Sequence, residues 1–76
     1  MAKSRWNWDT DPSVYLSASE GRYRVIQQGM PISRDMATPE EALSAASRFR
    51  LTVADRAWDG DRGEWVPLST VVRRSR

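Results

Sequence analysis

The chain has 76 residues, with 12 basic and 10 acidic side chains, no cysteine and no histidine. A chain of this length forms one domain and buries only about 60% of the surface that its unfolded state exposes. Without cysteine there are no disulfide bonds and no thiolate metal sites, and without histidine the commonest general base and metal ligand are missing. The composition therefore disfavours an enzyme, a metal site and a bound cofactor.

The net charge of +2 is a weak argument for nucleic acid as a partner, although all but one of the basic side chains are arginine. Arginine makes planar, bidentate contacts to carboxylates and phosphates. No apolar run approaches the ~20 residues that span a bilayer, and the first residues lack the apolar core of a signal peptide. We therefore expect a cytoplasmic protein that is not embedded in a membrane.

Residues 1–12 are interpreted as an N-terminal arm, because they show no sustained hydrophobic period. The arm contains Trp6 and Trp8, which point to the same side if this segment is extended. Two interpretations stay open for these rings. They either fold back onto the domain or form an exposed surface that adheres to a partner.

The first predicted strand covers residues 13–18, where apolar and polar residues alternate. Val14 and Leu16 share one side of this segment, as expected for a strand with one face in the core. Residues 19–21 end in glycine and give a turn signal. The pattern therefore predicts a hairpin with the segment that follows.

The second predicted strand covers residues 22–28, with Tyr23 and Val25 on one face and Arg22, Arg24 and Ile26 on the other. Residues 30–36 predict a third strand. Proline cannot donate a hydrogen bond to a neighbouring strand, so Pro31 confines this third strand to an edge of the sheet.

A helix over residues 39–50 is the clearest local signal in the sequence. Thr38 is suited to cap its first turn, and Glu41 stands where a capping box requires an acidic side chain. Pro39 falls at the first helical position, where its missing N–H group costs nothing. The helix is therefore predicted to begin at Pro39.

Apolar residues at helical spacing define the buried face of this helix, namely Ala42, Ala45, Ala46 and Phe49. Three small side chains in this stripe indicate close packing on a sheet. Phe49 is expected in the core, where truncation to alanine costs roughly 3 kcal/mol or more.

Residues 51–58 allow two interpretations. In the favoured one they form a strand that pairs with residues 64–68 across a turn at residues 59–63, and Trp58 and Trp65 pair across the hairpin. In the other, the helix continues to Trp58, since apolar residues keep a helical spacing to that point.

Together these elements predict an α+β fold. We expect a small antiparallel sheet of three to five strands in the order β-β-β-α-β-β, with one helix packed across one face. The domain is expected to cover residues 13–68, between the arm at 1–12 and a basic C-terminal tail at 69–76.

No catalytic or metal-binding pattern stands out. Asp59, Asp61 and Glu64 resemble the start of a calcium loop, but the glycine and the distant glutamate of such a loop are not in place. The four glycines are scattered among turns and form no phosphate-binding loop. We therefore expect no catalytic residue, no metal ligand and no cofactor.

Two sets of residues are candidates for binding. Tryptophan is enriched at protein interfaces, and the first set is Trp6, Trp8, Trp58 and Trp65. Arginine neutralises phosphates, and the second set is Arg22, Arg24, Arg34, Arg73, Arg74 and Arg76. We expect a small non-catalytic protein-binding module that regulates or inhibits a larger intracellular protein machine, of a size common among phage and mobile-element proteins. The alternative is a nucleic-acid-binding protein that uses an arginine-lined sheet face and the basic tail.

Overall fold

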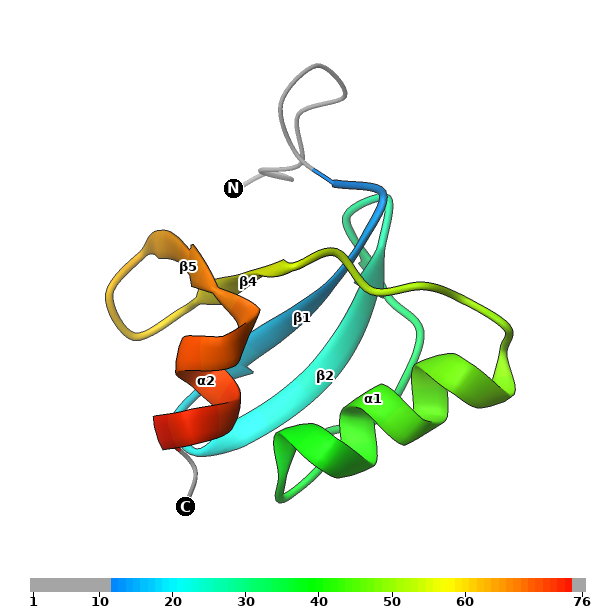
Figure 1. The fold of residues 1–76 in the computed structure, drawn as a ribbon, viewed down its shortest axis with the longest axis horizontal. Helices are drawn as coiled ribbons and strands as arrows, with labels where there is room; N and C mark the ends of the chain where they lie inside the picture. The colour runs from blue at the N-terminus through cyan, green and yellow to red at the C-terminus, as the bar shows by residue number, and fades with distance from the viewer. Residues whose placement is uncertain (1–11, 75–76) are drawn as a thin grey trace.

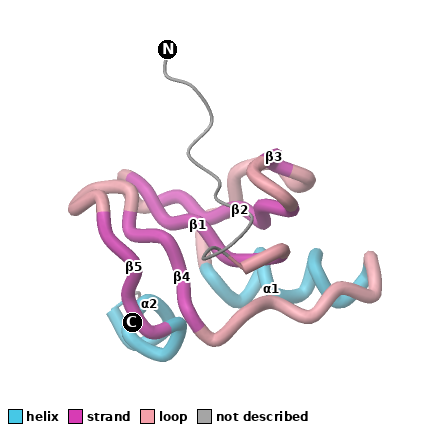
Figure 2. The backbone as a smooth tube through the Cα atoms, turned by 90° about the horizontal axis from the view of Figure 1, so that it is seen from above, coloured by secondary structure: helices cyan, strands magenta, loops and turns pink. Residues whose placement is uncertain are grey.

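A computed structural model of the chain describes residues 12–74 as a five-stranded sheet with two helices on one of its faces (Figures 1 and 2). The elements in chain order are β1 (Val14–Ser19), β2 (Arg22–Gln27), β3 (Met30–Pro31), α1 (Pro39–Arg48), β4 (Arg56–Asp59), β5 (Glu64–Pro67) and α2 (Leu68–Arg74). This arrangement confirms the predicted α+β class, the β-β-β-α-β-β order and the predicted upper limit of five strands.

The strands lie in the order β3-β2-β1-β4-β5, so β1 is central. Three of the four strand pairs are antiparallel, as expected from the sequence. The pair of β1 and β4 is parallel, which makes the sheet mixed rather than purely antiparallel. The connection through α1 is the reason, because it crosses over the sheet and returns the chain beside β1 in the same direction.

Small and medium-sized apolar side chains form the core between the sheet and the two helices. The fully buried set is Leu16, Val25, Ala42, Ala46, Ala57 and Val71. α1 packs on β1 and β2, and α2 packs on β4 and β5. Alanine on α1 and on β4 lets the backbones approach closely, which matches the close packing that the sequence predicted for the helix.

The start of α1 follows the predicted capping box. The backbone N–H of Glu41 donates to the hydroxyl of Thr38 at 3.2 Å, and the backbone N–H of Thr38 donates to the carboxylate of Glu41 at 3.3 Å. Pro39 is the first helical residue and is buried. Two of the unpaired N–H groups at this helix start are thereby satisfied.

The end of α1 differs from the prediction that placed Phe49 in the core. The helix ends at Arg48, and the Phe49 side chain is 58% exposed. Arg50 adopts a left-handed backbone with φ +61°, its N–H donates to Ser47, and the N–H of Leu51 donates to Ala46. This pair of hydrogen bonds is the Schellman motif, which turns the chain sharply and places Leu51 against the core instead.

The hairpin interpretation is confirmed, since β4 pairs with β5 and Trp58 stands directly opposite Trp65. The strand is shorter than predicted, because β4 begins at Arg56 and residues 51–55 are not part of it. The residues after β5 differ from the expected tail. Leu68 begins α2, its N–H donates to the carbonyl of Asp55 at 2.7 Å, and Val71 is buried. The segment expected to be a basic tail is therefore a helix up to Arg74, and residues 75–76 lie outside the described part.

After β3 the chain stays beside β2 as far as Ile32, whose backbone N–H donates to the carbonyl of Val25 at 2.9 Å, and it rejoins β2 at Met36, which pairs with Tyr23. The third strand predicted over residues 30–36 is therefore limited to Met30–Pro31. In the gap, the backbone N–H of Val25 donates to the hydroxyl of Ser33 at 2.9 Å, so a side chain takes the place of a strand carbonyl. This detour carries Asp35 to the sheet surface, where its carboxylate pairs with Arg24.

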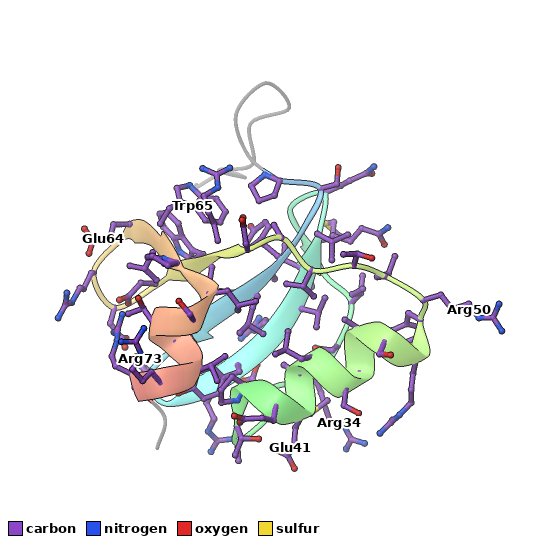
Figure 3. The ribbon with its side chains drawn as sticks, viewed as in Figure 1. Arg34, Glu41, Arg50, Glu64, Trp65 and Arg73 are labelled. Atoms are coloured by element: carbon purple, nitrogen blue, oxygen red, sulfur yellow. The ribbon has the colours of Figure 1, made fainter. Side chains whose placement is uncertain are left out.

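We expect replacement of Arg50 by glycine to stabilise the protein. A left-handed backbone costs a residue with a side chain about 1–2 kcal/mol, whereas the greater freedom of unfolded glycine offsets about 0.5–1 kcal/mol of the gain. The net stabilisation of roughly 0.5–1 kcal/mol raises the melting temperature by about 4 °C, as measured by circular dichroism. Figure 3 shows the Arg50 side chain at the end of α1, extending away from the domain.

Arg48→Gly is the matched control, because it makes the same change inside the last turn of α1 and costs about 1 kcal/mol. Phe49→Ala is expected to change stability by less than about 0.5 kcal/mol, as an exposed substitution does. If Arg50→Gly lowers the melting temperature as much as Arg48→Gly, the left-handed cap is wrong.

Candidate binding surface on the open face of the sheet

Both described helices lie on the same side of the sheet, and no element within residues 12–74 covers the other side (Figure 2). Leu16, Val25 and Ala57 point toward the helices, so their neighbours along each strand point away from them. We call this outward side the open face. Its side chains on β1, β2, β4 and β5 are Tyr15, Ser17, Ser19, Arg22, Arg24, Ile26, Arg56, Trp58, Trp65 and Pro67, of which Ile26 is buried.

Three aromatic side chains meet on the open face, and we call them the aromatic cluster. The ring centroids of Tyr15 and Trp65 lie 4.8 Å apart at an interplanar angle of 75°. Those of Trp58 and Trp65 lie 5.3 Å apart at 71°. Edge-to-face pairs of this kind contribute about 0.5–1.5 kcal/mol each beyond the area that they bury. The half-buried rings are therefore held in fixed positions at the surface.

Trp65 is the centre of this cluster. Its ring extends from β5 across β4 to reach Tyr15 on β1, and the guanidinium carbon of Arg56 lies 5.3 Å from its ring centroid. A cation above an aromatic ring at this distance is attracted by the ring's electron density. Figure 3 shows Trp65 beside β4 and β5, away from Arg73 on α2. The cluster thus joins three strands of the sheet.

A second part of the open face is polar, and we call it the arginine hollow. It has a volume of about 180 Å³ and is lined by Ser17, Ser19, Glu20, Arg22, Arg24, Ile26 and Asp35. The Nε of Arg24 lies 2.9 Å from the carboxylate of Asp35, and both side chains are partly exposed. Since Ser17 pairs with Arg24 on one side and Trp58 on the other, the hollow adjoins the aromatic cluster.

The protein-binding set predicted from the sequence is only partly brought together. Trp58 and Trp65 are in contact, whereas Trp6 and Trp8 lie outside the described residues. Tyr15 was not predicted, although its place on the outward side of an alternating strand pointed to it. Its partner Trp65 is distant in sequence, and that contact depends on the strand order.

The predicted nucleic-acid set does not gather in one place. Arg22 and Arg24 share the open face, as the sequence alternation predicted. Arg34 is exposed in the loop before α1, and Arg73 is exposed on α2, on the helix side. The last two members of the set are Arg74, which contacts Asp59, and Arg76, which lies outside the described residues.

Asp59 is buried, with 2% of its surface exposed, and it organises the turn between β4 and β5. Its carboxylate accepts hydrogen bonds from the backbone N–H groups of Asp61 and Arg62 at 3.1 and 3.2 Å, and from Arg74 at 3.1 Å. Burial by itself raises the pKa of Asp59, but the bond from Arg74 and the backbone bonds outweigh it and lower the pKa below its usual value. The carboxylate is therefore a charged structural anchor for α2.

The described residues contain neither a metal-binding cluster nor a membrane-spanning helix. Within residues 12–74, no group of three or more acidic side chains is arranged to hold a metal ion. Neither described helix is long and apolar enough to cross a membrane. In comparisons with known proteins, no family model, no curated protein and no solved structure matches the chain.

The sheet edges are poor sites for adding a strand from a partner. The two edge strands are β3, with two residues, and β5, with four. Each contains a proline, Pro31 or Pro67, and so has one N–H donor fewer. Short, proline-containing edges resist pairing with another chain. Of the surfaces described here, the open face is therefore the best suited to binding.

We expect Asp59→Asn to destabilise the protein by about 2 kcal/mol at neutral pH, because it weakens hydrogen bonds to a charged acceptor. The melting temperature then falls by roughly 10 °C. Asp55→Asn is the control, since Asp55 is exposed and the change is expected to be nearly neutral.

The same pair of proteins tests the pKa of Asp59. Because the folded protein lowers this pKa, its stabilisation is complete well above the ordinary value of 3.8 and is lost as the pH falls through the lower folded value. Melting curves from neutral to strongly acidic pH are expected to converge for the wild type and Asp59→Asn only below 3.8. Convergence already between neutral pH and the ordinary value contradicts the assignment.

Proposed function

We propose that the protein is a small binding module without a catalytic step, which regulates or inhibits a larger protein machine in the cytoplasm by docking through its open face. One observation carries the proposal, namely the aromatic cluster of Tyr15, Trp58 and Trp65 beside Arg56 on a sheet face that the helices leave uncovered. Tryptophan, tyrosine and arginine are the residue types that dominate binding energy at protein interfaces.

The geometry of the cluster supports a protein partner. The rings are already held by one another, so binding orders few additional side chains and loses little conformational entropy. Their half-buried state still leaves apolar surface beside polar groups of the arginine hollow. An apolar centre with a polar rim is the usual composition of a protein interface.

A tagged protein is expected to capture a stoichiometric protein partner from its native host, and Trp65→Ala is expected to abolish the capture. A central interface tryptophan is worth about 2 kcal/mol or more, which weakens binding about thirtyfold or more. The control is Phe49→Ala, which removes an exposed aromatic ring at the end of α1 and is expected to leave the capture unchanged.

Melting curves of both variants separate lost binding from lost folding. A half-buried tryptophan contributes to stability, so the comparison is made at a temperature at which Trp65→Ala is folded. A folded Trp65→Ala variant that captures the same partner as the wild type, in the same amount, rules out the open face as the docking site.

Nucleic acid is the second candidate, because Arg22, Arg24 and Arg56 share the open face with aromatic rings. Proteins that bind single strands combine a basic groove with rings on which bases stack. Two features weigh against it here. The carboxylate of Asp35 already neutralises Arg24, and neighbouring side chains take up part of the Trp65 ring.

Fluorescence anisotropy with mixed-sequence single-stranded DNA and RNA and with duplex DNA tests this second candidate. We expect affinities weaker than the ~10⁻⁴ to 10⁻⁶ M range of non-specific binding at physiological salt. Tighter binding, with a log–log salt slope near −0.7 per phosphate contact on single strands and a loss in the double variant Arg22→Glu, Arg24→Glu, makes nucleic acid the partner instead.

A further inference from the structure

The two parts of the open face lie at a defined separation. Arg22 on β2 stands opposite Ser19 on β1, and Trp58 on β4 stands beside Ser17 on β1. The two side chains are therefore two strands apart and two residues apart along the sheet. With strands about 4.8 Å apart and about 3.4 Å per residue, their Cα atoms are separated by about 12 Å along a diagonal.

The ion pair between Arg24 and Asp35 indicates which kind of ligand the arginine hollow can bind. Arg24 holds the carboxylate of Asp35 at 2.9 Å, which shows that an acidic side chain fits there. Arg22, in contrast, forms no ion pair within residues 12–74 and is exposed at the same hollow. One arginine is thus occupied by an internal acid, and its neighbour two residues away is available.

The charges at the hollow favour a single acidic side chain over a chain of phosphates. Arg22 and Arg24 are balanced there by Glu20 and Asp35, so the four charges sum to zero. A polyanion brings several charges close to both carboxylates and is repelled by them, whereas one carboxylate can approach Arg22 alone. The hollow therefore suits an acidic residue of a protein.

We propose that the open face recognises an extended segment of its protein partner that carries one acidic residue, in which an apolar anchor packs on the aromatic cluster and the carboxylate pairs with Arg22. An extended chain spans about 3.3–3.6 Å per residue, so the separation of about 12 Å corresponds to three or four residues between anchor and acid. Asp35 opposes this pairing, because its carboxylate lines the same hollow and holds Arg24. This inference rests on the proposed function and adds the chemistry and spacing of the ligand.

Synthetic extended peptides with one leucine anchor and one glutamate test the spacing. The glutamate is placed one, four or seven positions after the leucine in an uncharged background, and each peptide is titrated into the ¹⁵N-labelled full chain. The four-position peptide is expected to shift the indole signals of Trp58 and Trp65 and the amide of Arg22. It is expected to bind about tenfold tighter than the other two peptides and than its glutamine counterpart.

Three protein variants locate the acid. Arg22→Gln is expected to weaken the four-position peptide about tenfold and to leave the glutamine peptide unchanged. Arg48→Gln, the matched loss of an exposed arginine on α1, is expected to change neither affinity. Asp35→Asn is expected to tighten the four-position peptide at least threefold, because it removes a carboxylate that repels the incoming acid and it releases Arg24. An unfolded variant cannot imitate such a gain in affinity.

Several outcomes overturn the inference. One is that the three peptides bind with equal affinity. Another is that millimolar peptide shifts none of the NMR signals of Trp58, Trp65 and Arg22. A third is that single-stranded DNA binds more tightly than every peptide. If Trp65→Ala loses partner capture but Arg22→Gln and Asp35→Asn have no effect, the proposed function stands and only the acidic ligand is ruled out. If none of these variants has an effect, both the proposed function and the acidic ligand are ruled out.

Discussion

The strand register set by Leu16, Val25 and Ala57 is the constraint on which the rest of the molecule depends. Their side chains must lie under the helices, because a small domain has few other apolar groups to bury. Strand side chains alternate, so this choice sends Arg22 and Trp58 to the opposite side. A shift by one residue would bury the arginine and expose the core, and the open face is therefore a direct consequence of core packing.

Local chemistry explains which parts of the fold were predictable. The cap at Thr38 and the tryptophan pair of the hairpin depend on residues close in sequence, and the structure confirms them. The predicted end of α1 was wrong because Arg50 occupies the left-handed position after the helix. Glycine is usual at this position and would have marked the helix end in the sequence. Phe49 fitted the helical period, but the chain turned before its side chain reached the core. Two other features depend on contacts between segments that are distant in sequence, and a local pattern cannot predict such contacts. They are the parallel pairing of β1 with β4 and the helix α2 in place of the basic tail.

The candidate site was partly predictable for the same reason. Alternation placed Arg22 and Arg24 on one face, and the hairpin joined Trp58 to Trp65. The contribution of Tyr15 required the strand order, because β4 lies between its strand and that of its aromatic partner. The anchoring role of Asp59 needed the position of Arg74, which only α2 provides. That ion pair between the buried Asp59 and the partly exposed Arg74 ties α2 to the sheet, and it takes an arginine away from the set expected to bind phosphate.

The prolines at the two edges of the sheet affect the tendency of the protein to aggregate at high concentration. A sheet with tryptophan and tyrosine on a face that neither described helix covers is at risk of stacking into fibres, since exposed edge strands act as templates for further strands. Pro31 and Pro67 remove donors from the two strands where such growth would begin. Growth of a fibre by strand addition at either of these edges is therefore disfavoured.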